Sequence, residues 1–227
     1  MGSSEFPAVL FDLDGTLIDS VYQHVGAWRD SLEKAGHAVP AWKIHRRIGM
    51  SGKSFVTELL RETETKSRRI NLDELEHGHD TRFARTITTL RPLPGASDLL
   101  QHLAQSKVRI AIATTGNLKH TILVLTRLKV PAGISIVTGD DVRNAKPAPD
   151  IFMATAEKLR IAINDCIVVG DSVWDLIAAG RKGAISVGFL SGGYGADELE
   201  RAGALRIYSD PADMLLHLEQ LGLPGLS

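Results

Sequence analysis

The stretch from Ala8 to Ser20, AVLFDLDGTLIDS, decides how the rest of the chain is interpreted. Its first four residues are apolar and end at a turn signal, which is typical of a strand buried in a parallel sheet. Asp12 and Asp14 follow the run directly, and Gly15 comes next. Ligands of open α/β sheets bind beyond the carboxyl ends of the strands, where both carboxylates are expected to lie. An ordinary exposed turn also uses Asp and Gly, so this segment alone leaves both interpretations open.

The composition is that of an ordinary globular protein without an overall electrostatic preference. The 227 residues are 44% hydrophobic and 23% charged, with a formal net charge of −1. Neither nucleic acid nor a membrane surface is therefore an expected partner. Cys166 is the single cysteine, no signal peptide or membrane span is visible, and a cytoplasmic location is expected. Residues 1–6, MGSSEF, are interpreted as partly a cloning remnant.

Helical periodicity without strand signals fills the chain from residue 21 to residue 90. The last helix of this block is expected over residues 72–89, before the segment RPLPG at 91–95 interrupts the pattern. The sequence thus predicts an all-α domain, residues 21–90, inserted into a core formed by residues 1–20 and 91–227.

The chain after Pro94 alternates between helix and strand patterns. Apolar runs near 108–113, 134–137 and 166–169 are expected as strands, with helical segments between them. This alternation predicts an α/β fold, a Rossmann-like parallel sheet with helices on both faces.

Several polar motifs follow the predicted strands or precede the predicted helices. They are Thr114, Thr115, Gly116 and Asn117; Lys146; and Asp171 and Asp175. Each has an ordinary explanation when taken alone, as a turn, a helix N-cap or a solvated lysine. Because the carboxyl ends of parallel strands meet at one edge, the motifs are expected to converge with Asp12 and Asp14.

Phosphoryl transfer is the chemistry that needs this combination of residues. Asp12 can attack phosphorus and form an aspartyl-phosphate, while Asp14 can protonate the leaving oxygen and later activate water. Lys146 and the backbone N–H groups that open a helix can balance the charge of the phosphate. Asp12 and Asp171 also offer the hard oxygen ligands that suit Mg²⁺.

In order along the chain, the motifs resemble those of the haloacid dehalogenase (HAD) superfamily. The matching segments are DLDGT at 12–16, Thr114, Lys146 in KPAPD, and GDSVWD at 170–175. The helical insertion is similar to the mobile cap of the phosphoglycolate phosphatase and β-phosphoglucomutase branch. The resemblance implies that Asp12 is the nucleophile and Asp14 the general acid/base. Thr114 and Lys146 would bind the phosphate, with Thr115 and Gly116 beside them.

The resemblance also implies a Mg²⁺ cofactor and a role for the cap. The metal ligands would be Asp12, the backbone carbonyl of Asp14, and Asp171, with Asp175 in support through water. The cap would set substrate choice, and its candidate residues are His24, Arg47, Gly49 and Lys53.

Neighbouring activities of the superfamily differ at single positions. Haloacid dehalogenases lack the second aspartate, and phosphonoacetaldehyde hydrolases replace it and use a cap lysine, for which Lys53 is the candidate. Asp14 argues against both. A non-catalytic HAD-fold binding protein would lack a nucleophile or a metal ligand, and none is missing.

Phosphatase and sugar-phosphate mutase share Asp12 and Asp14, so the core motifs leave both activities open. We expect a Mg²⁺-dependent, phosphoglycolate phosphatase-like enzyme, with a mutase of the β-phosphoglucomutase type as the alternative. The expected partner is a small phosphorylated metabolite, and the chain is expected to be a monomer or a small homo-oligomer.

Overall fold

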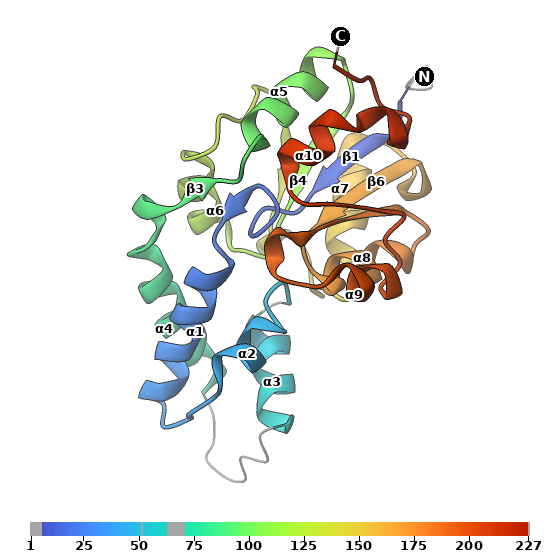
Figure 1. Cartoon of the computed structure of the whole chain (residues 1–227). Coiled ribbons are helices and arrows are strands. Elements are labelled where there is room, and N and C mark those ends of the chain that lie inside the picture. The colour runs from blue at the N-terminus through green and yellow to red at the C-terminus, as the bar shows by residue number, and fades with distance from the viewer. Residues whose placement is uncertain (1–5, 51, 63–70, 227) are drawn as a thin grey trace.

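A computed structural model describes residues 6–50, 52–62 and 71–226 of the chain. Within these residues, six parallel strands form one sheet in the order β5-β4-β1-β6-β7-β8 (Figure 1). They are β1 (Ala8–Phe11), β4 (Ile110–Ala113), β5 (Ser135–Val137), β6 (Cys166–Gly170), β7 (Ile185–Phe189) and β8 (Arg206–Tyr208). The predicted Rossmann-like fold is confirmed, and β1 occupies the interior of the sheet.

Helices cover both faces of this sheet (Figure 1). One face carries α5 (Ala96–Gln105), α6 (Leu118–Leu125) and α10 (Pro211–Leu216). The other carries α7 (Asp150–Leu159) and α8 (Val173–Gly180), with α9 (Ala196–Arg201) beside α8. Among the described helices, none combines the length and the apolar character needed to cross a membrane.

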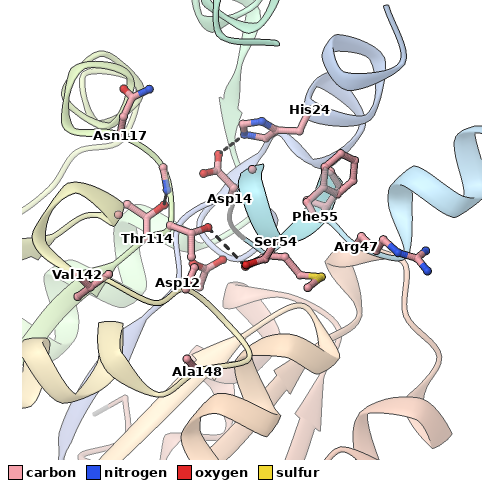
Figure 2. A pocket seen from close by; sticks show the side chains of 18 of the residues that line it. Asp12, Asp14, His24, Arg47, Ser54, Phe55, Thr114, Asn117, Val142 and Ala148 are labelled. Carbon is pink, nitrogen blue, oxygen red and sulfur yellow. Dashed lines mark hydrogen bonds and ion pairs between the residues drawn. The ribbon is translucent and has the colours of Figure 1, made fainter. Parts of the chain in front are cut away.

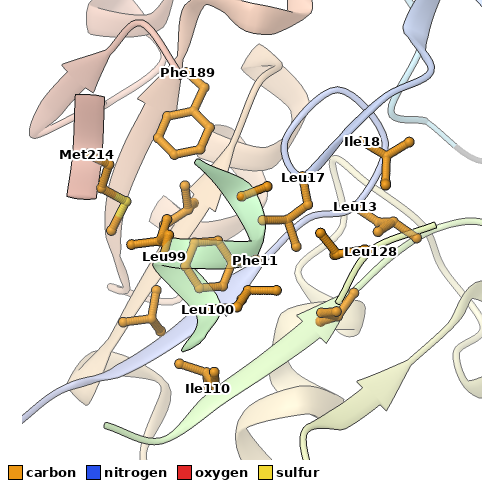
Figure 3. Packing of buried hydrophobic residues seen from close by; sticks show 14 of the residues in the cluster. Phe11, Leu13, Leu17, Ile18, Leu99, Leu100, Ile110, Leu128, Phe189 and Met214 are labelled. Carbon is orange, nitrogen blue, oxygen red and sulfur yellow. The ribbon is translucent and has the colours of Figure 1, made fainter. Parts of the chain in front are cut away.

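The side chains of β1 alternate between the two layers of helices. Val9 and Phe11 belong to a cluster shared with α5 and α10, whereas Ala8 and Leu10 pack with α7 and α8. Figure 3 shows Phe11 close to Leu100 in the first of these clusters. Because successive side chains of a strand point to opposite faces, a strand covered on both sides needs an unbroken apolar run.

The chain that follows β1 forms a group of helices at the carboxyl edge of the sheet (Figure 1). They are α1 (Val21–Lys34), α2 (Ala41–His45), α3 (Gly52–Glu62) and α4 (Leu72–Ala84). Trp28, Ile44 and Phe55 belong to a hydrophobic cluster formed by this group. The division of the chain into a core and an inserted cap domain stays a prediction.

The helix expected over residues 72–89 ends at Ala84 instead. Thr86 Oγ1 donates to the carbonyl of Phe83 at 2.8 Å, and Thr89 Oγ1 donates to the carbonyl of Thr86 at 2.7 Å. Hydroxyl groups that bind nearby carbonyls compete with helical hydrogen bonds. Residues 87–89 accordingly form a 3₁₀ helix.

A short antiparallel ribbon joins the two segments that connect these helices to the sheet. Ile18 of β2 (Ile18–Asp19) lies opposite Pro92 of β3 (Arg91–Pro92), and Asp19 lies opposite Arg91. The chain therefore enters and leaves the helical segment side by side.

Candidate active site

Three carboxylates converge beyond the ends of two neighbouring strands. Asp12 follows β1, Asp171 follows β6, and Asp175 lies in the first turn of α8. One oxygen of each lies within 4.8 Å of an oxygen of the others, and all three side chains are buried. This pairing follows from the topology, because β1 and β6 are adjacent parallel strands whose carboxyl ends coincide.

Lys146 lies beneath the site and is completely buried, unlike an ordinary loop lysine. Its Nζ atom is 2.5 Å from Asp12 Oδ1 and 2.6 Å from Asp175 Oδ1. Burial alone would lower the pKa of Lys146, but the two carboxylates outweigh burial and raise it. The ammonium group therefore stays charged and partly neutralises the carboxylates.

Asp175 has two functions in the structure. Its Oδ2 accepts hydrogen bonds from the Ser172 backbone N–H at 3.2 Å and from Ser172 Oγ at 2.6 Å. The bond from the Ser172 backbone N–H is part of a capping box at the start of α8, while Oδ1 faces Lys146. The ordinary interpretation of the GDSVWD motif, a capped helix, thus holds alongside its place in the acidic cluster.

The carboxylates carry more negative charge than Lys146 balances. Burial raises the pKa of Asp12 to about 7, although the charge of Lys146 opposes the rise. Burial also raises the pKa of Asp171 well above its ordinary value, and the neighbouring Asp175 and Asp12 add to this effect. A divalent cation would favour the ionised form of these groups, and Mg²⁺ prefers such oxygen ligands. The residues present therefore fit Mg²⁺.

Asp171 is positioned by contacts that the sequence did not reveal. Thr16 Oγ1 donates to Asp171 Oδ1 at 2.9 Å. A Cβ atom on Gly15 or on Gly192 would overlap Asp171 Oδ2, so both positions require glycine. Gly15 also has a φ of +83°, a conformation that glycine adopts readily.

The loop after β4 follows the predicted turn and N-cap pattern. Thr114 Oγ1 accepts a hydrogen bond from the Gly116 backbone N–H at 3.0 Å. Asn117 Oδ1 accepts from the His120 backbone N–H at 2.9 Å and caps α6. The Gly116 N–H is thus already engaged, while the Thr114 hydroxyl retains its own hydrogen for donation.

The Asp14 side chain points away from the acidic cluster and toward α1, as Figure 2 shows. Its Oδ1 accepts a hydrogen bond from Ser20 Oγ at 2.6 Å and lies 3.2 Å from His24 Nε2. Burial would raise the pKa of Asp14, but His24 and Ser20 outweigh burial and lower it. His24, a candidate specificity residue, therefore contacts the candidate general acid/base directly.

A cavity of about 880 Å³ opens between the sheet edge and the helical segment. The predicted site residues that line it are Asp12, Asp14, His24, Arg47, Gly49, Thr114, Thr115, Gly116 and Asp171. Lys146 and Asp175 lie below its surface. Lys53 is the second residue of α3, but its side chain is outside the described part of the structure.

Arg47 and Gly49 occupy different parts of the cavity wall. The Arg47 guanidinium points away from Asp12 and Asp14 in Figure 2, and its Nη1 donates to the carbonyl of Lys43 at 3.0 Å. Gly49 has a φ of +98°, and a Cβ atom there would lie 2.8 Å from Ser172 Oγ. Gly49 therefore lets the helical segment approach the core closely.

Comparison with known proteins identifies the family. The family model described as haloacid dehalogenase-like hydrolase matches residues 6–183, and the chain belongs to this family. A crystal structure of a hydrolase from Pseudomonas syringae is similar at a TM-score of 0.90 and 43% identity, covering 95% of this chain and 99% of that chain.

Two relatives carry specific activities in their names. A phosphoglycolate phosphatase from Neisseria meningitidis is 31% identical over 194 residues, 83% of this chain and 81% of the relative. A β-phosphoglucomutase from Bacillus subtilis is 29% identical over 218 residues, 93% of this chain and 94% of the relative. The predicted resemblance to this branch of the superfamily is confirmed.

Proposed function

We propose that the protein is a Mg²⁺-dependent phosphatase that hydrolyses a small phosphorylated metabolite through an aspartyl-phosphate. The placement of Asp12 carries this proposal. Its carboxylate follows β1, meets the buried ammonium of Lys146 and lies beside Asp171 at the floor of a cavity. A nucleophile that approaches a phosphate dianion needs such compensation of charge.

In the first step, an Asp12 oxygen forms a bond to phosphorus as the ester P–O bond breaks. Asp14 gives a proton to the leaving oxygen, which departs as an alcohol. In the second step, Asp14 takes a proton from water, whose oxygen attacks phosphorus and displaces the Asp12 carboxylate. Lys146 and the Thr114 hydroxyl stabilise the charge of the phosphoryl oxygens in both steps.

Asp12, Asp171 and the backbone carbonyl of Asp14 would hold Mg²⁺, which supplies further positive charge to the phosphoryl group. Asp175 would support this site through water, and it contacts Lys146 directly. The cytoplasmic location and the monomeric or small oligomeric state stay predictions.

A sugar-phosphate mutase is the second candidate, and the relative named β-phosphoglucomutase favours it. The relative named phosphoglycolate phosphatase favours hydrolysis of a small acid phosphate. Both reactions use the same two aspartates. They differ in whether the closed cavity retains a phosphorylated intermediate long enough to return the phosphate to it.

A panel of phosphorylated small metabolites with added Mg²⁺ tests the proposal. The panel includes phosphoglycolate, hexose and hexitol phosphates and p-nitrophenyl phosphate, and phosphate release is measured without a bisphosphate activator. Wild-type protein is expected to release phosphate, and Asp12→Asn is expected to lose turnover while remaining folded by circular dichroism. If a hexose 1-phosphate became its 6-phosphate faster than phosphate appeared, the mutase candidate would replace ours.

A further inference from the structure

A continuous series of polar contacts runs from Asp14 through the helical segment to the core. His24 Nδ1 on α1 lies 3.0 Å from His79 Nε2 on α4. His79 Nδ1 lies 3.0 Å from Asp80 Oδ1, and Asp80 Oδ2 accepts a hydrogen bond from Asn117 Nδ2 at 3.0 Å. Asn117 caps α6 next to the Thr114 loop, so the series begins and ends at the active site.

Aromatic packing fixes both imidazole rings of this series. The His79 ring stacks on Trp28 with the ring centres 4.3 Å apart. The His24 ring stacks on Phe83 with the ring centres 3.8 Å apart. His79 is also buried, with 8% of its surface exposed. These stacks fix the plane of each ring, and in this arrangement His24 Nδ1 faces His79 Nε2.

The series has a direction because Asp80, which follows His79 in it, is a carboxylate. Burial would raise the pKa of Asp80, but the hydrogen bond from His79 outweighs burial and lowers it. An ionised carboxylate only accepts hydrogen bonds, so the hydrogen lies on His79 Nδ1. Burial lowers the pKa of His79 to about 4, which leaves this ring neutral at pH 7. His79 Nε2 is then an acceptor, and His24 Nδ1–H is its donor.

We propose that His79 and Asp80 are positioning residues for the general acid/base Asp14, acting through His24. His79 and Asp80 hold the His24 ring so that Nδ1 donates a hydrogen bond to His79 and Nε2 faces Asp14. The inference rests on the proposed function, in which Asp14 protonates the leaving oxygen. With Nδ1–H donated to His79, the Nε2 edge of the His24 ring faces Asp14 Oδ1 at 3.2 Å and limits where that carboxylate can lie.

The contact between Asp80 and Asn117 adds a second consequence. Asp80 belongs to α4 of the helical segment, whereas Asn117 belongs to the core. The series is complete only when α4 lies against the start of α6. The orientation of His24, and with it that of Asp14, thus depends on the docking of the helical segment over the cavity.

Kinetics with two classes of ester test the positioning role. Two variants interrupt the series: Asp80→Ala removes the carboxylate, and His79→Phe keeps an aromatic ring but removes both nitrogens. An alkyl phosphate needs a proton on its leaving oxygen, whereas p-nitrophenyl phosphate leaves as a stable phenolate. Both variants are therefore expected to lower kcat/KM for the best alkyl ester by about tenfold or more, and for p-nitrophenyl phosphate by about threefold or less.

Asp30→Ala is the matched control. Asp30 Oδ2 lies 2.8 Å from Arg82 Nη2, so this variant removes an ion pair between the same two helices, α1 and α4, outside the series. It is expected to leave the ratio of the two kcat/KM values unchanged. Equal losses for both esters in Asp80→Ala and His79→Phe, or no loss in either variant, would overturn the positioning role.

A measurement without turnover separates this inference from the proposed function. Two-bond ¹H–¹⁵N correlation spectra at pH 7 report which nitrogen of each imidazole carries hydrogen. The wild-type protein is expected to show His79 with hydrogen on Nδ1 and a bare Nε2, and Asp80→Ala is expected to lose this preference. Hydrogen on His79 Nε2 in the wild type would overturn the inference even if the protein is an active phosphatase. A wild type inactive on every ester would instead reject the proposed function.

Discussion

The Nζ atom of Lys146 lies 2.5 Å from Asp12 Oδ1, and both side chains are buried. Asp175 Oδ1 approaches the same ammonium group at 2.6 Å. A buried lysine between two carboxylates links the stability of the sheet edge to its reactivity, because burial raises the pKa of Asp12 and the charge of Lys146 opposes that rise.

Replacing Lys146 with methionine is expected to impair both properties. The uncompensated carboxylates should lower the free energy of unfolding by about 3–5 kcal/mol, measured by urea denaturation. The loss of charge at the phosphoryl group should lower kcat/KM by about a hundredfold or more. The control is Lys158→Met, because Lys158 lies on the exposed side of α7 and donates to the carbonyl of Ile136. A Lys146→Met variant with the activity of this control would remove Lys146 from the mechanism.

Addition of Mg²⁺ is expected to stabilise the folded protein as well as to support turnover. At a concentration a hundredfold above Kd, the ion should add about 2.7 kcal/mol to the free energy of unfolding. Thermal denaturation with EDTA and then with Mg²⁺ measures this shift. Asp171→Asn should abolish this stabilisation by Mg²⁺. The control Asp197→Asn, at an exposed position that pairs with Arg201, should retain it. Full turnover without metal would indicate dehalogenase-like chemistry instead.

His79 is expected to make stability depend on pH. Its pKa lies at about 4 in the folded chain, below the ordinary value of 6.5, because burial disfavours the imidazolium form. Between these two values the unfolded chain takes up a proton that the folded chain does not. Stability is therefore fully present above pH 6.5 and falls by about 3 kcal/mol as the pH drops to 4.

Comparison of His79→Phe with His77→Phe isolates the contribution of His79 to the pH dependence of stability. His79→Phe should show a shallower decline of unfolding free energy with falling pH than the wild type does. His77→Phe, at an exposed position of the same helix, should keep the wild-type slope. Identical slopes for the wild type and His79→Phe would show that His79 is not held neutral in the folded chain.

Gly49→Ala tests how closely the helical segment must approach the core. The added methyl group would lie 2.8 Å from Ser172 Oγ, at a φ of +98° that alanine rarely adopts. We expect kcat/KM to fall by about tenfold, because a displacement of about 1 Å is enough to impair a positioned active site. Gly26→Ala is the control, since Gly26 lies within α1 with open space around it. Equal kcat/KM values for Gly49→Ala and the wild type would show that this close approach is not needed.

The sequence predicted the sheet because its signals are local. The apolar run Ala8–Phe11 ends in Asp12, and the alternation of helix and strand patterns continues to the end of the chain. Asp12 and Asp171 each follow the end of a strand, so the pairing of parallel strands alone brings them together. The ribbon of β2 and β3 was not predicted, because strands of two residues carry no hydrophobic period.

Other parts of the site depend on contacts between distant segments. His79 and Asp80 lie in a segment with ordinary helical periodicity, and nothing in their spacing predicts a contact with His24. In the structure His79 contacts His24 and Asp80 contacts His79. Gly192 ends the 3₁₀ helix that follows β7, and only the position of Asp171 shows why it must be glycine. Contacts of this kind depend on how distant segments pack together, and the sequence alone does not predict that packing.

The pairing of β2 with β3 has a consequence for how this protein can vary. Residues opposite each other in an antiparallel ribbon lie about 5 Å apart, so Asp19 and Arg91 are close enough to be joined by a tight turn. A change in the length of the chain between Asp19 and Arg91 would therefore leave the order of the sheet strands unchanged. A shortened chain would leave the same aspartates at an open surface, where a phosphate on a folded macromolecule could reach them.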